Sequence, residues 1–246
     1  MKNYIFCLII SLSILSCENS TKIRLTKLEG SLAYETARLE NKTINFDDKD
    51  YFFQFDVIDY ELGKQTEKEF SFDLANSAKG QHIHFIVNNG PYSAFYSSEF
   101  NKKLEESNNV ILAFLSRSYH ESVKNPNAFF LTQIGEGKKI DLTKDFLFYS
   151  RPKGVYKGKD TEKLLLDFYL VNTNISPSGN KVRATIQDAE FIIDEWAPYY
   201  IEGLPKGEIS IKLELIDQMG ELIETPFNPS IRTWPVTPKL IPQISR

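Results

Sequence analysis

Cysteine is nearly absent from this chain of 246 residues, which contains only Cys7 and Cys17. Both lie close to the N-terminus, so the rest of the chain has no thiol for a disulfide, for thiol catalysis or for a zinc–thiolate site. Stability must therefore come from the packing of side chains. The length is sufficient for one large domain or for two ordinary ones.

Several signatures of known chemistry are also missing. The sequence has no glycine-rich phosphate loop and no Gly-x-Ser-x-Gly nucleophile elbow. The segment SRSYHES (116–122) has the residue types of a catalytic triad, but adjacency in sequence is no evidence of convergence in space. No spacing of carboxylates singles out a glycosidase pair. We therefore expect a protein that is not an enzyme.

Charge gives no sign of a nucleic-acid partner. The formal net charge is −4, and residues of both signs are mixed along the chain without a basic stripe. After Cys17 no apolar run is long enough for a membrane helix. Partners other than nucleic acid remain open at this stage.

The N-terminus reads as a secretion signal. Lys2 precedes an apolar run from Tyr4 to Leu15 that is too short to span a bilayer and fits the hydrophobic region of a signal peptide. The run ends in ILSC, which resembles a bacterial lipobox. This predicts a signal peptide at residues 1–16, lipidation of Cys17, and a polar tether within residues 17–27. The alternative is an ordinary secretory signal with a chance cysteine.

These segments predict the location of the protein. We expect a lipid-anchored protein of the bacterial cell envelope whose first partner is the membrane that holds its N-terminal lipid. No strongly acidic stretch follows Cys17. The favoured location is therefore the outer membrane, on the side that faces the periplasm.

An internal repeat predicts the architecture. GQHIHFIVNN (80–89) matches GNKVRATIQD (179–188) at an offset of 99 residues, and the same offset places Val110, Leu112 and Phe114 on Ile209, Ile211 and Leu213. Short alternating runs bounded by Asn, Gly and Pro indicate an all-β class. We predict two tandem immunoglobulin-like antiparallel β-sandwiches, at residues 28–138 and 139–246. The alternative is one larger sandwich or barrel.

The predicted strands share this alternating pattern and its turn boundaries. They lie at residues 31–38, 51–60, 81–88, 92–97, 110–117, 128–134, 146–151, 163–172, 181–187, 189–195, 209–216 and 230–236.

Three blocks carry a resemblance. GQHIHFIVNN, AFLSRSYHESVKN and WAPYYIEGLPKGEISIKLELID resemble blocks of uncharacterised bacterial exported proteins and lipoproteins with tandem immunoglobulin-like β-sandwich domains. The resemblance covers most of the chain after the signal. It implies a location and a fold, and it implies no activity.

Two of the three histidines lie in one predicted strand, HIHFIV (82–87). Side chains alternate across a strand, so His82 and His84 are expected on the outer face, like Lys181 and Arg183 of the second repeat. The offset of 99 adds three apolar residues to that outer face, namely Ile111, Ala113 and Leu115.

An apolar outer face is expected to be covered or to bind a ligand or partner. Internal cover is the favoured interpretation. It would come from the tether, from the second sandwich, or from an inserted segment that contains Phe70, Phe72 and Leu74. The alternative is a ligand surface for a protein or another partner.

The histidines also suggest a metal site. A His-x-His pair on one strand face can chelate zinc or copper, and His120, with Glu121 beside it, can supply a further ligand. We favour a solvated or cover-contacting pair with no cofactor, and keep zinc or copper as the alternative.

A second alternative concerns sugars. Trp196, Tyr199 and Tyr200 are of the kind that stack on sugar rings, although aromatic residues between strands usually plug the end of a core. The favoured function is thus a non-catalytic binding or accessory module. The alternatives are a periplasmic metal-binding protein using His82, His84 and His120, and a carbohydrate-binding lipoprotein with a glycan partner.

The anchor gives a first prediction. Cys17→Ser removes the acceptor for the lipid, so we expect an unprocessed or soluble form in place of the anchored one. Detergent-phase partitioning measures this. A mutant that partitions like the native protein would contradict the lipidation of Cys17.

Overall fold

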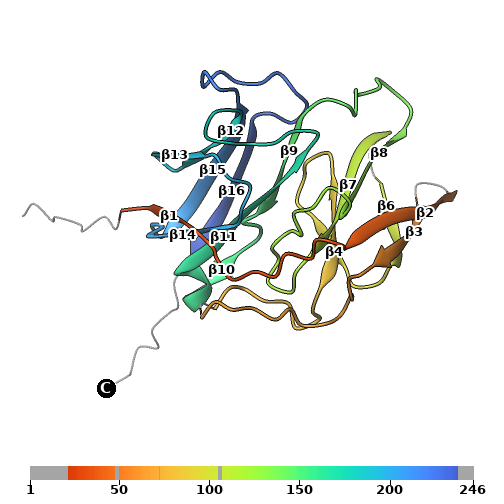
Figure 1. Cartoon of the computed structure of the whole chain (residues 1–246), viewed down its shortest axis with the longest axis horizontal. Helices are drawn as coiled ribbons and strands as arrows, with labels where there is room; N and C mark the ends of the chain where they lie inside the picture. The colour runs from red at the N-terminus through yellow and green to blue at the C-terminus, as the bar shows by residue number, and fades with distance from the viewer. Residues whose placement is uncertain (1–21, 48–49, 72, 105–106, 238–246) are drawn as a thin grey trace, which may run out of the picture.

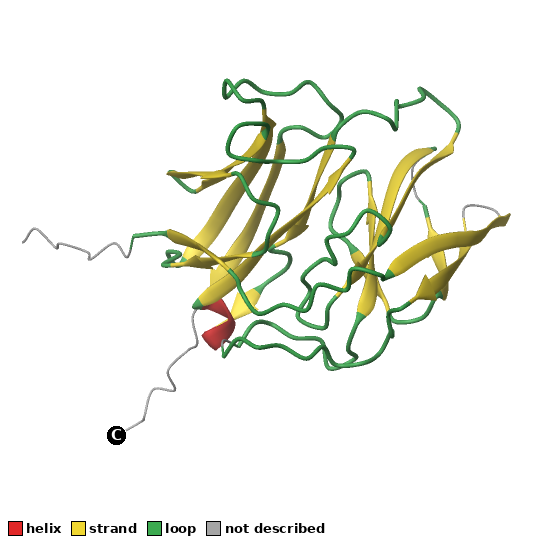
Figure 2. Cartoon of the chain, viewed as in Figure 1, coloured by secondary structure: helices red, strands yellow, loops and turns green. Residues whose placement is uncertain are grey.

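The structure is a computed structural model that describes residues 22–47, 50–71, 73–104 and 107–237. The predicted signal peptide, Cys17 and Phe72 lie outside these residues. Within them the chain forms sixteen strands and one short 3₁₀ helix (Figure 1, Figure 2). None of the helical structure described is long and apolar enough to cross a membrane.

The first sandwich holds its core between two antiparallel sheets. Phe53, Phe55, Phe85 and Phe100 fill this core, because alternate residues of each strand face the opposite sheet. One sheet has the order β2 (Arg38–Asp47), β3 (Asp50–Ile58), β6 (Glu99–Lys103). The other has the order β5 (Ser93–Phe95), β4 (His82–Val87), β7 (Asn108–Ser116), β8 (Phe129–Gly135).

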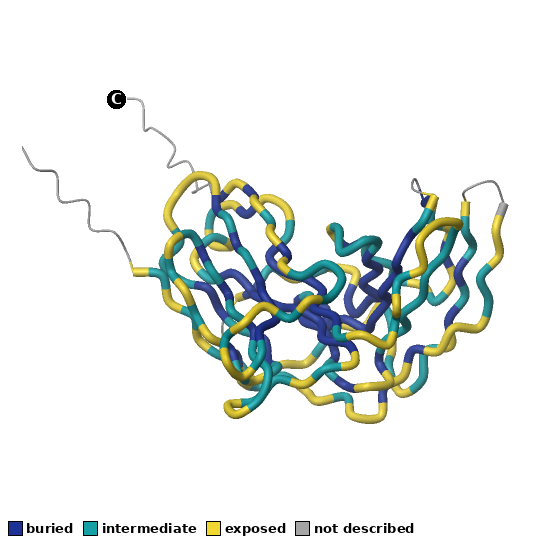
Figure 3. The backbone as a smooth tube through the Cα atoms, turned by 90° about the horizontal axis from the view of Figure 1, so that it is seen from above, coloured by how far each residue is buried: buried dark blue, intermediate teal, exposed yellow. Residues whose placement is uncertain are grey.

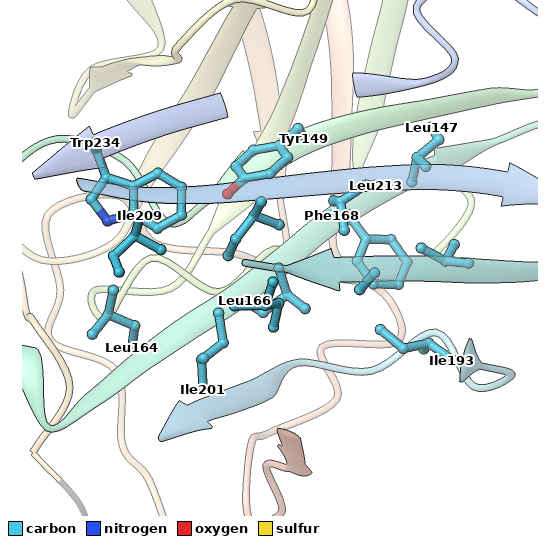
Figure 4. Close-up of a cluster of buried hydrophobic side chains, with 14 of the residues drawn as sticks. Leu147, Tyr149, Leu164, Leu166, Phe168, Ile193, Ile201, Ile209, Leu213 and Trp234 are labelled. Carbon is cyan, nitrogen blue, oxygen red and sulfur yellow. The ribbon is translucent and has the colours of Figure 1, made fainter. Parts of the chain in front are cut away.

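The second sandwich is built in the same way. Figure 4 shows Leu166 and Phe168 of one sheet among Ile209 and Leu213 of the other. The first sheet has the order β1 (Arg24–Lys27), β14 (Tyr199–Glu202), β11 (Lys163–Val171), β9 (Phe146–Arg151). The second has the order β10 (Tyr156–Lys157), β16 (Ser230–Thr237), β15 (Gly207–Ile216), β12 (Lys181–Ile186), β13 (Ala189–Ile193), and the 3₁₀ helix η1 (Gly158–Thr161) follows β10.

The predicted fold class is confirmed. The chain is an all-β protein of two antiparallel β-sandwiches, the first formed by strands between residues 38 and 135 and the second mainly by strands from residue 146 onward. Among the described strands, the short β10 is the exception to antiparallel pairing, because it runs parallel to β16.

The N-terminal segment corrects part of the predicted tether. Residues 24–27 form β1, which pairs with β14 from Arg24↔Glu202 to Lys27↔Tyr199. The reason is that Ile23 and Leu25 pack against the core of the second sandwich. The chain then runs across the molecule to β2 (Figure 1). The first sandwich is thus inserted between two strands of the second.

The strand predicted at residues 31–38 is also wrong. Ser31 makes only an isolated bridge to Lys68, and Tyr34 has a φ of +52° in a turn, which interrupts an extended strand. The ladder begins at Arg38, opposite Ile58 of β3. Strand β2 therefore starts where the prediction ended.

The two sandwiches share an apolar interface. Ile86, Leu112 and Phe114 of the first sandwich belong to one buried cluster with Phe148 and Tyr169 of the second. The rings of Phe114 and Tyr169 stack with centroids 4.5 Å apart. Figure 3 shows buried backbone on both sides of this junction. The predicted internal cover over the outer face of β4 is confirmed, and the second sandwich supplies it.

The apolar residues assigned to that outer face were assigned wrongly. Ile111, Ala113 and Leu115 are fully buried inside the first sandwich, where Leu115 lies opposite Ile83 and Ile111 opposite Val87. They are therefore no ligand surface.

A one-residue slip in the repeat explains the error. In the second sandwich Val182, the counterpart of Ile83, lies opposite Leu215. Leu115 and Leu215 differ by 100 residues, whereas the repeat was read at 99. A slip of one residue moves every side chain of a strand to the other face.

Polar contacts also cross the junction. The carboxylate of Asp167, which is fully buried, accepts a hydrogen bond from Ser122 Oγ (2.9 Å) and pairs with Lys124 Nζ (2.6 Å). Arg232 Nη2 donates to the backbone oxygens of Asn89 (2.9 Å) and Gly90 (2.8 Å). Each contact joins a turn of the first sandwich to a strand of the second. We therefore expect the two sandwiches to unfold together.

This interface gives a stability prediction. Phe114→Ala opens a cavity between the sandwiches and should lower the free energy of unfolding by about 3–5 kcal/mol. Urea denaturation measures the loss. Met219, 78% exposed, is the control, since Met219→Ala should change stability by less than about 0.5 kcal/mol. A loss below about 1 kcal/mol for Phe114→Ala would show that the interface is not closely packed.

Candidate metal centre

The three histidines of the chain meet at one point. One ring nitrogen from each of His82, His84 and His120 lies within 4.8 Å of the other two. His82 Nε2 is 2.9 Å from His84 Nε2 and 3.1 Å from His120 Nδ1. Of the predicted site residues, the structure therefore brings the three candidate metal ligands together.

Strand alternation and strand pairing place two of them. His82 and His84 are two residues apart on β4, so they share a face with Ile86. On β7 they lie opposite Ser116 and Phe114. That face is the one that packs on the second sandwich. The sequence placed His82 and His84 on the correct face of the strand, but that face is buried.

His120 is delivered by a tight turn after β7. Its backbone N–H donates to Arg117 O (2.8 Å), and Arg117 N–H donates to Glu121 O (2.8 Å). The backbone at His120 has a φ of +70°. This left-handed conformation costs a residue with a side chain about 1–2 kcal/mol.

The second sandwich has the same turn with glycine in that place. Gly220 N–H donates to Asp217 O (3.1 Å), and Asp217 N–H donates to Glu221 O (2.9 Å). Gly220 has a φ of +87°, which glycine adopts without penalty. The offset of 100 thus aligns His120 with Gly220. The first sandwich has an imidazole where the turn itself favours glycine.

Hydroxyl groups from both sandwiches contact His84. Ser116 Oγ lies 3.2 Å from its Nε2, and Ser150 Oγ of β9 lies 3.3 Å from its Nδ1. Tyr92 stacks on the same imidazole with ring centroids 3.5 Å apart and planes 15° apart. His82 and His84 have no exposed surface, whereas His120 is partly exposed. Any approach to the cluster is therefore past His120.

A backbone carbonyl fixes the tautomer of His82. Its Nδ1 lies 2.8 Å from Gly80 O, and a carbonyl oxygen only accepts, so Nδ1 carries the proton. The neutral ring then has a lone pair on Nε2. That lone pair faces the nitrogens of His84 and His120. A carbonyl on the remote nitrogen is also the usual way in which a metal-binding histidine is oriented.

Burial keeps all three rings neutral. It lowers the pKa of His82 to about 4 and that of His120 to about 2, and it holds the pKa of His84 well below its usual value. The cations Arg151 and Lys153 add to each of these shifts. The neutral imidazole is the form that binds metals.

Tyr92, Arg151 and Lys153 complete the surroundings. The hydroxyl of Tyr92 lies 3.3 Å from His120 Nδ1, and burial raises its pKa, so it is a neutral phenol in the metal-free protein. Lys153 Nζ and Arg151 Cζ lie 4.1 and 5.4 Å from the centroid of its ring. Glu121, named with His120 from the sequence, instead pairs with Arg117 at 3.0 Å.

Sequence reasoning did not find Tyr92, Ser116, Ser150, Arg151 and Lys153 as members of the site. Tyr92 stands a few residues after His84, but no spacing rule marks it. Ser150 and Arg151 come from β9 of the second sandwich, and only the packing of the two sandwiches brings them to the histidines. A prediction of contacts between the two packed sheets is the signal that would have found Ser150 and Arg151.

The aromatic candidates Trp196 and Tyr199 are partly buried and pack against the core of the second sandwich. Trp196 donates through Nε1 to Phe168 O (3.0 Å), and its ring meets Tyr169 edge to face at 5.1 Å. The hydroxyl of Tyr199 donates to Glu195 O (2.9 Å), and Tyr200 is buried. Trp196 also borders a surface groove with Leu28 and Pro198.

Comparisons with known proteins add no family. No protein-family model matches the chain, and no curated protein sequence matches it. Among solved structures it is similar to the central fibronectin-III array of RIM-binding protein, at 11% identity and a TM-score of 0.29 over 87% of this chain and 72% of that one. It is also similar to the fibronectin(III)-like modules of Clostridium thermocellum CbhA, at 12% identity and a TM-score of 0.29 over 80% of this chain and 95% of that one. Similarity at this level carries no argument about the site.

The lowered pKa values predict a pH dependence of stability. Between the unfolded pKa of 6.5 and the folded value of about 4 for His82, the unfolded chain binds a proton that the folded chain does not. Stability is therefore unaffected above pH 6.5 and falls as the pH falls through this window. For His82 alone the loss at pH 5 is roughly 2 kcal/mol.

Urea unfolding at pH 7 and pH 5 measures this loss in the native protein and in a variant that lacks the imidazoles. Carboxylates contribute equally in both proteins, so the difference between the two losses comes from the histidines. The triple variant His82→Gln, His84→Gln, His120→Gly is that control. Equal losses in the two proteins would contradict the assignment of neutral buried histidines.

Proposed function

We propose that this protein binds a transition-metal ion, zinc or copper, through His82, His84 and His120. The observation that carries the proposal is the convergence of three neutral ring nitrogens within 4.8 Å at the junction of the sandwiches. Within the described residues this is the one group of three or more histidine, cysteine or acidic side chains whose ligand atoms lie close enough to share an ion. Three histidines leave one position of a tetrahedral ion for a further ligand.

The spacing supports an ion of this size. A metal–nitrogen bond of about 2.0–2.1 Å places two ligands of a tetrahedral ion about 3.3–3.4 Å apart. The nitrogen of His82 lies 2.9 and 3.1 Å from the other two nitrogens, and the remaining pair lies within 4.8 Å. Small rotations of the rings therefore suffice to bring all three nitrogens to one ion.

The donor set supports a particular group of metals. Imidazole nitrogen suits zinc, copper, nickel and iron, whereas calcium and magnesium require oxygen ligands. The cluster contains no carboxylate and no thiolate among the described residues. Zinc and copper, which the sequence analysis kept as the alternative to a site without a cofactor, fit this set.

The metal-free cluster leaves a hydrogen-bonding conflict that a cation resolves. His82 Nε2 has one lone pair, which accepts one good hydrogen bond. Two nitrogens approach it, at 2.9 and 3.1 Å. If the second of these nitrogens has no proton, its lone pair faces the lone pair of His82 Nε2, and the two repel each other. A bound cation satisfies all three lone pairs at once.

The burial of the site supports a binding role rather than a catalytic one. His82 and His84 have no exposed surface and His120 is only partly exposed, so a substrate could reach the cluster only past His120. We propose that the protein is a lipid-anchored, metal-binding accessory protein of the cell envelope, held by Cys17 on the periplasmic side of the outer membrane. The engagement of Trp196 and Tyr199 in packing gives no support to carbohydrate binding.

Metal binding should stabilise the native protein in a way that depends on His120. At a free concentration one hundred times the dissociation constant, Zn²⁺ or Cu²⁺ adds about 2.7 kcal/mol to the free energy of unfolding. His120→Gly and His120→Asn remove the ligand and suit the left-handed turn, so both variants should fold in metal-free buffer and lose the metal-dependent rise. Thermal melts with and without metal measure this.

The matched control is Gly220→Asn, which perturbs the same turn of the second sandwich and keeps every histidine. It should lower the melting temperature and retain the full metal-dependent rise. A native protein that shows no rise with either metal, or a His120→Gly variant that keeps it, would refute the site.

A further inference from the structure

The proposed site has an unbalanced charge. Three neutral imidazoles do not reduce the two positive charges of a divalent ion. The ion would also be buried, because two of its three ligands, His82 and His84, have no exposed surface. Arg151 and Lys153, both cations, lie beside the cluster over the ring of Tyr92. Buried positive charge without a counter-charge is strongly unfavourable. An anionic fourth ligand therefore stabilises the complex.

Carboxylates do not supply that charge. The ion pairs of the described residues place no carboxylate on Arg151 or Lys153. Glu121 is held by Arg117 at 3.0 Å, and Asp167 is held by Lys124 at 2.6 Å. Among the described residues, the phenol of Tyr92 is the ionisable hydroxyl whose oxygen contacts a ring nitrogen of the cluster.

Tyr92 already stands at ligand distance. Its oxygen lies 3.3 Å from His120 Nδ1, which falls within the separation of about 2.8–3.4 Å between adjacent ligands of one ion in square-planar or tetrahedral coordination. Its ring lies flat on His84 at 3.5 Å, and the residue is 4% exposed. Packing therefore holds the phenol against two of the three imidazoles.

The two cations are arranged around Tyr92. Lys153 Nζ lies 4.1 Å from the centroid of its ring, and because His84 covers one face at 3.5 Å, the ammonium group occupies the other. Arg151 Cζ lies 5.4 Å from the same centroid. Nearby positive charge favours the anionic form of an oxygen acid. Arg151 and Lys153 repel a metal ion that has only neutral ligands, but they stabilise a phenolate bound to that ion.

We infer that Tyr92 is the fourth ligand of the site and that its phenolic oxygen binds the metal ion as tyrosinate. The inference rests on the proposed metal site. As the metal–oxygen bond forms, the O–H bond breaks and the proton leaves to solvent. The metal ion is then bound by three nitrogens and one oxygen, and the net charge of the complex falls from +2 to +1.

This ligand set narrows the metal. Nitrogen and oxygen donors are typical of Cu²⁺, whereas Cu⁺ prefers thiolate and thioether sulfur. Beyond Cys17 the chain has one sulfur-containing residue, Met219, and it is 78% exposed in a turn of the second sandwich. The site is therefore suited to Cu²⁺ rather than to Cu⁺, and Cu²⁺ is the probe with a visible signature.

Titration of the full-length protein with Cu²⁺, followed by absorption spectroscopy, tests the inference. Tyrosinate bound to Cu²⁺ gives a visible charge-transfer band that histidine ligands alone do not give. Tyr92→Phe should abolish the band and weaken Cu²⁺ binding by at least about tenfold. The matched control is Tyr96→Phe, because the Tyr96 ring lies 5.0 Å from that of His82 while its hydroxyl bonds Ser77 Oγ at 2.7 Å. This variant should keep both the band and the affinity.

The outcomes separate the two proposals. Cu²⁺ binding by the native protein without the band, or a Tyr92→Phe variant that keeps the band, overturns the role of Tyr92 and leaves the three-histidine site standing. No binding of Cu²⁺ or Zn²⁺ by the native protein overturns both. If Tyr92→Phe does not fold, resonance Raman spectra of the native complex decide the question, since phenolate ring modes support the inference and their absence overturns it.

Discussion

The site depends on the packing of the β4–β7 sheet of the first sandwich against the β9–β11 sheet of the second. Phe114 stacks on Tyr169 with ring centroids 4.5 Å apart. Around this contact the facing side chains of both sheets are buried. The same contact buries His82 and His84, holds them neutral and brings Ser150 and Arg151 to them. An isolated first sandwich would expose an apolar face with two solvated histidines, and their pKa values would return toward the usual range.

The two repeats show what the interface changes. Lys212 and Glu214 lie on the outer face of β15, where Glu214 pairs with Arg183 at 2.9 Å. The offset of 100 places Leu112 and Phe114 at these positions in the first sandwich. Histidines likewise stand where the second sandwich has Lys181 and Arg183. The first sandwich therefore has an apolar interface where the second has a charged surface. It also has His120 where the second has Gly220.

Sequence alone predicted the fold class, the repeat and the face of β4 that carries the histidines, because strand alternation and turn residues are local signals. It placed Ile111, Ala113 and Leu115 on the wrong face of their strand. A gap of one residue between two repeats of low similarity is hard to detect, and it moves every side chain of the strand to the other face. It also missed β1, because four residues far from their partner strand β14 carry little pattern of their own. The convergence of His120 depends on one left-handed turn, and the contribution of Ser150 depends on how two sandwiches dock. Neither is a local property of the sequence.

X-ray absorption spectroscopy of the native protein loaded with one equivalent of Cu²⁺ or Zn²⁺ shows directly whether the three histidines bind the metal. We expect nitrogen ligands at about 2.0–2.1 Å, with the outer scattering of three imidazole rings. A coordination sphere of water and carboxylate oxygens without imidazole scattering would place the metal elsewhere on the surface. That result would contradict a metal centre at the junction of the two sandwiches.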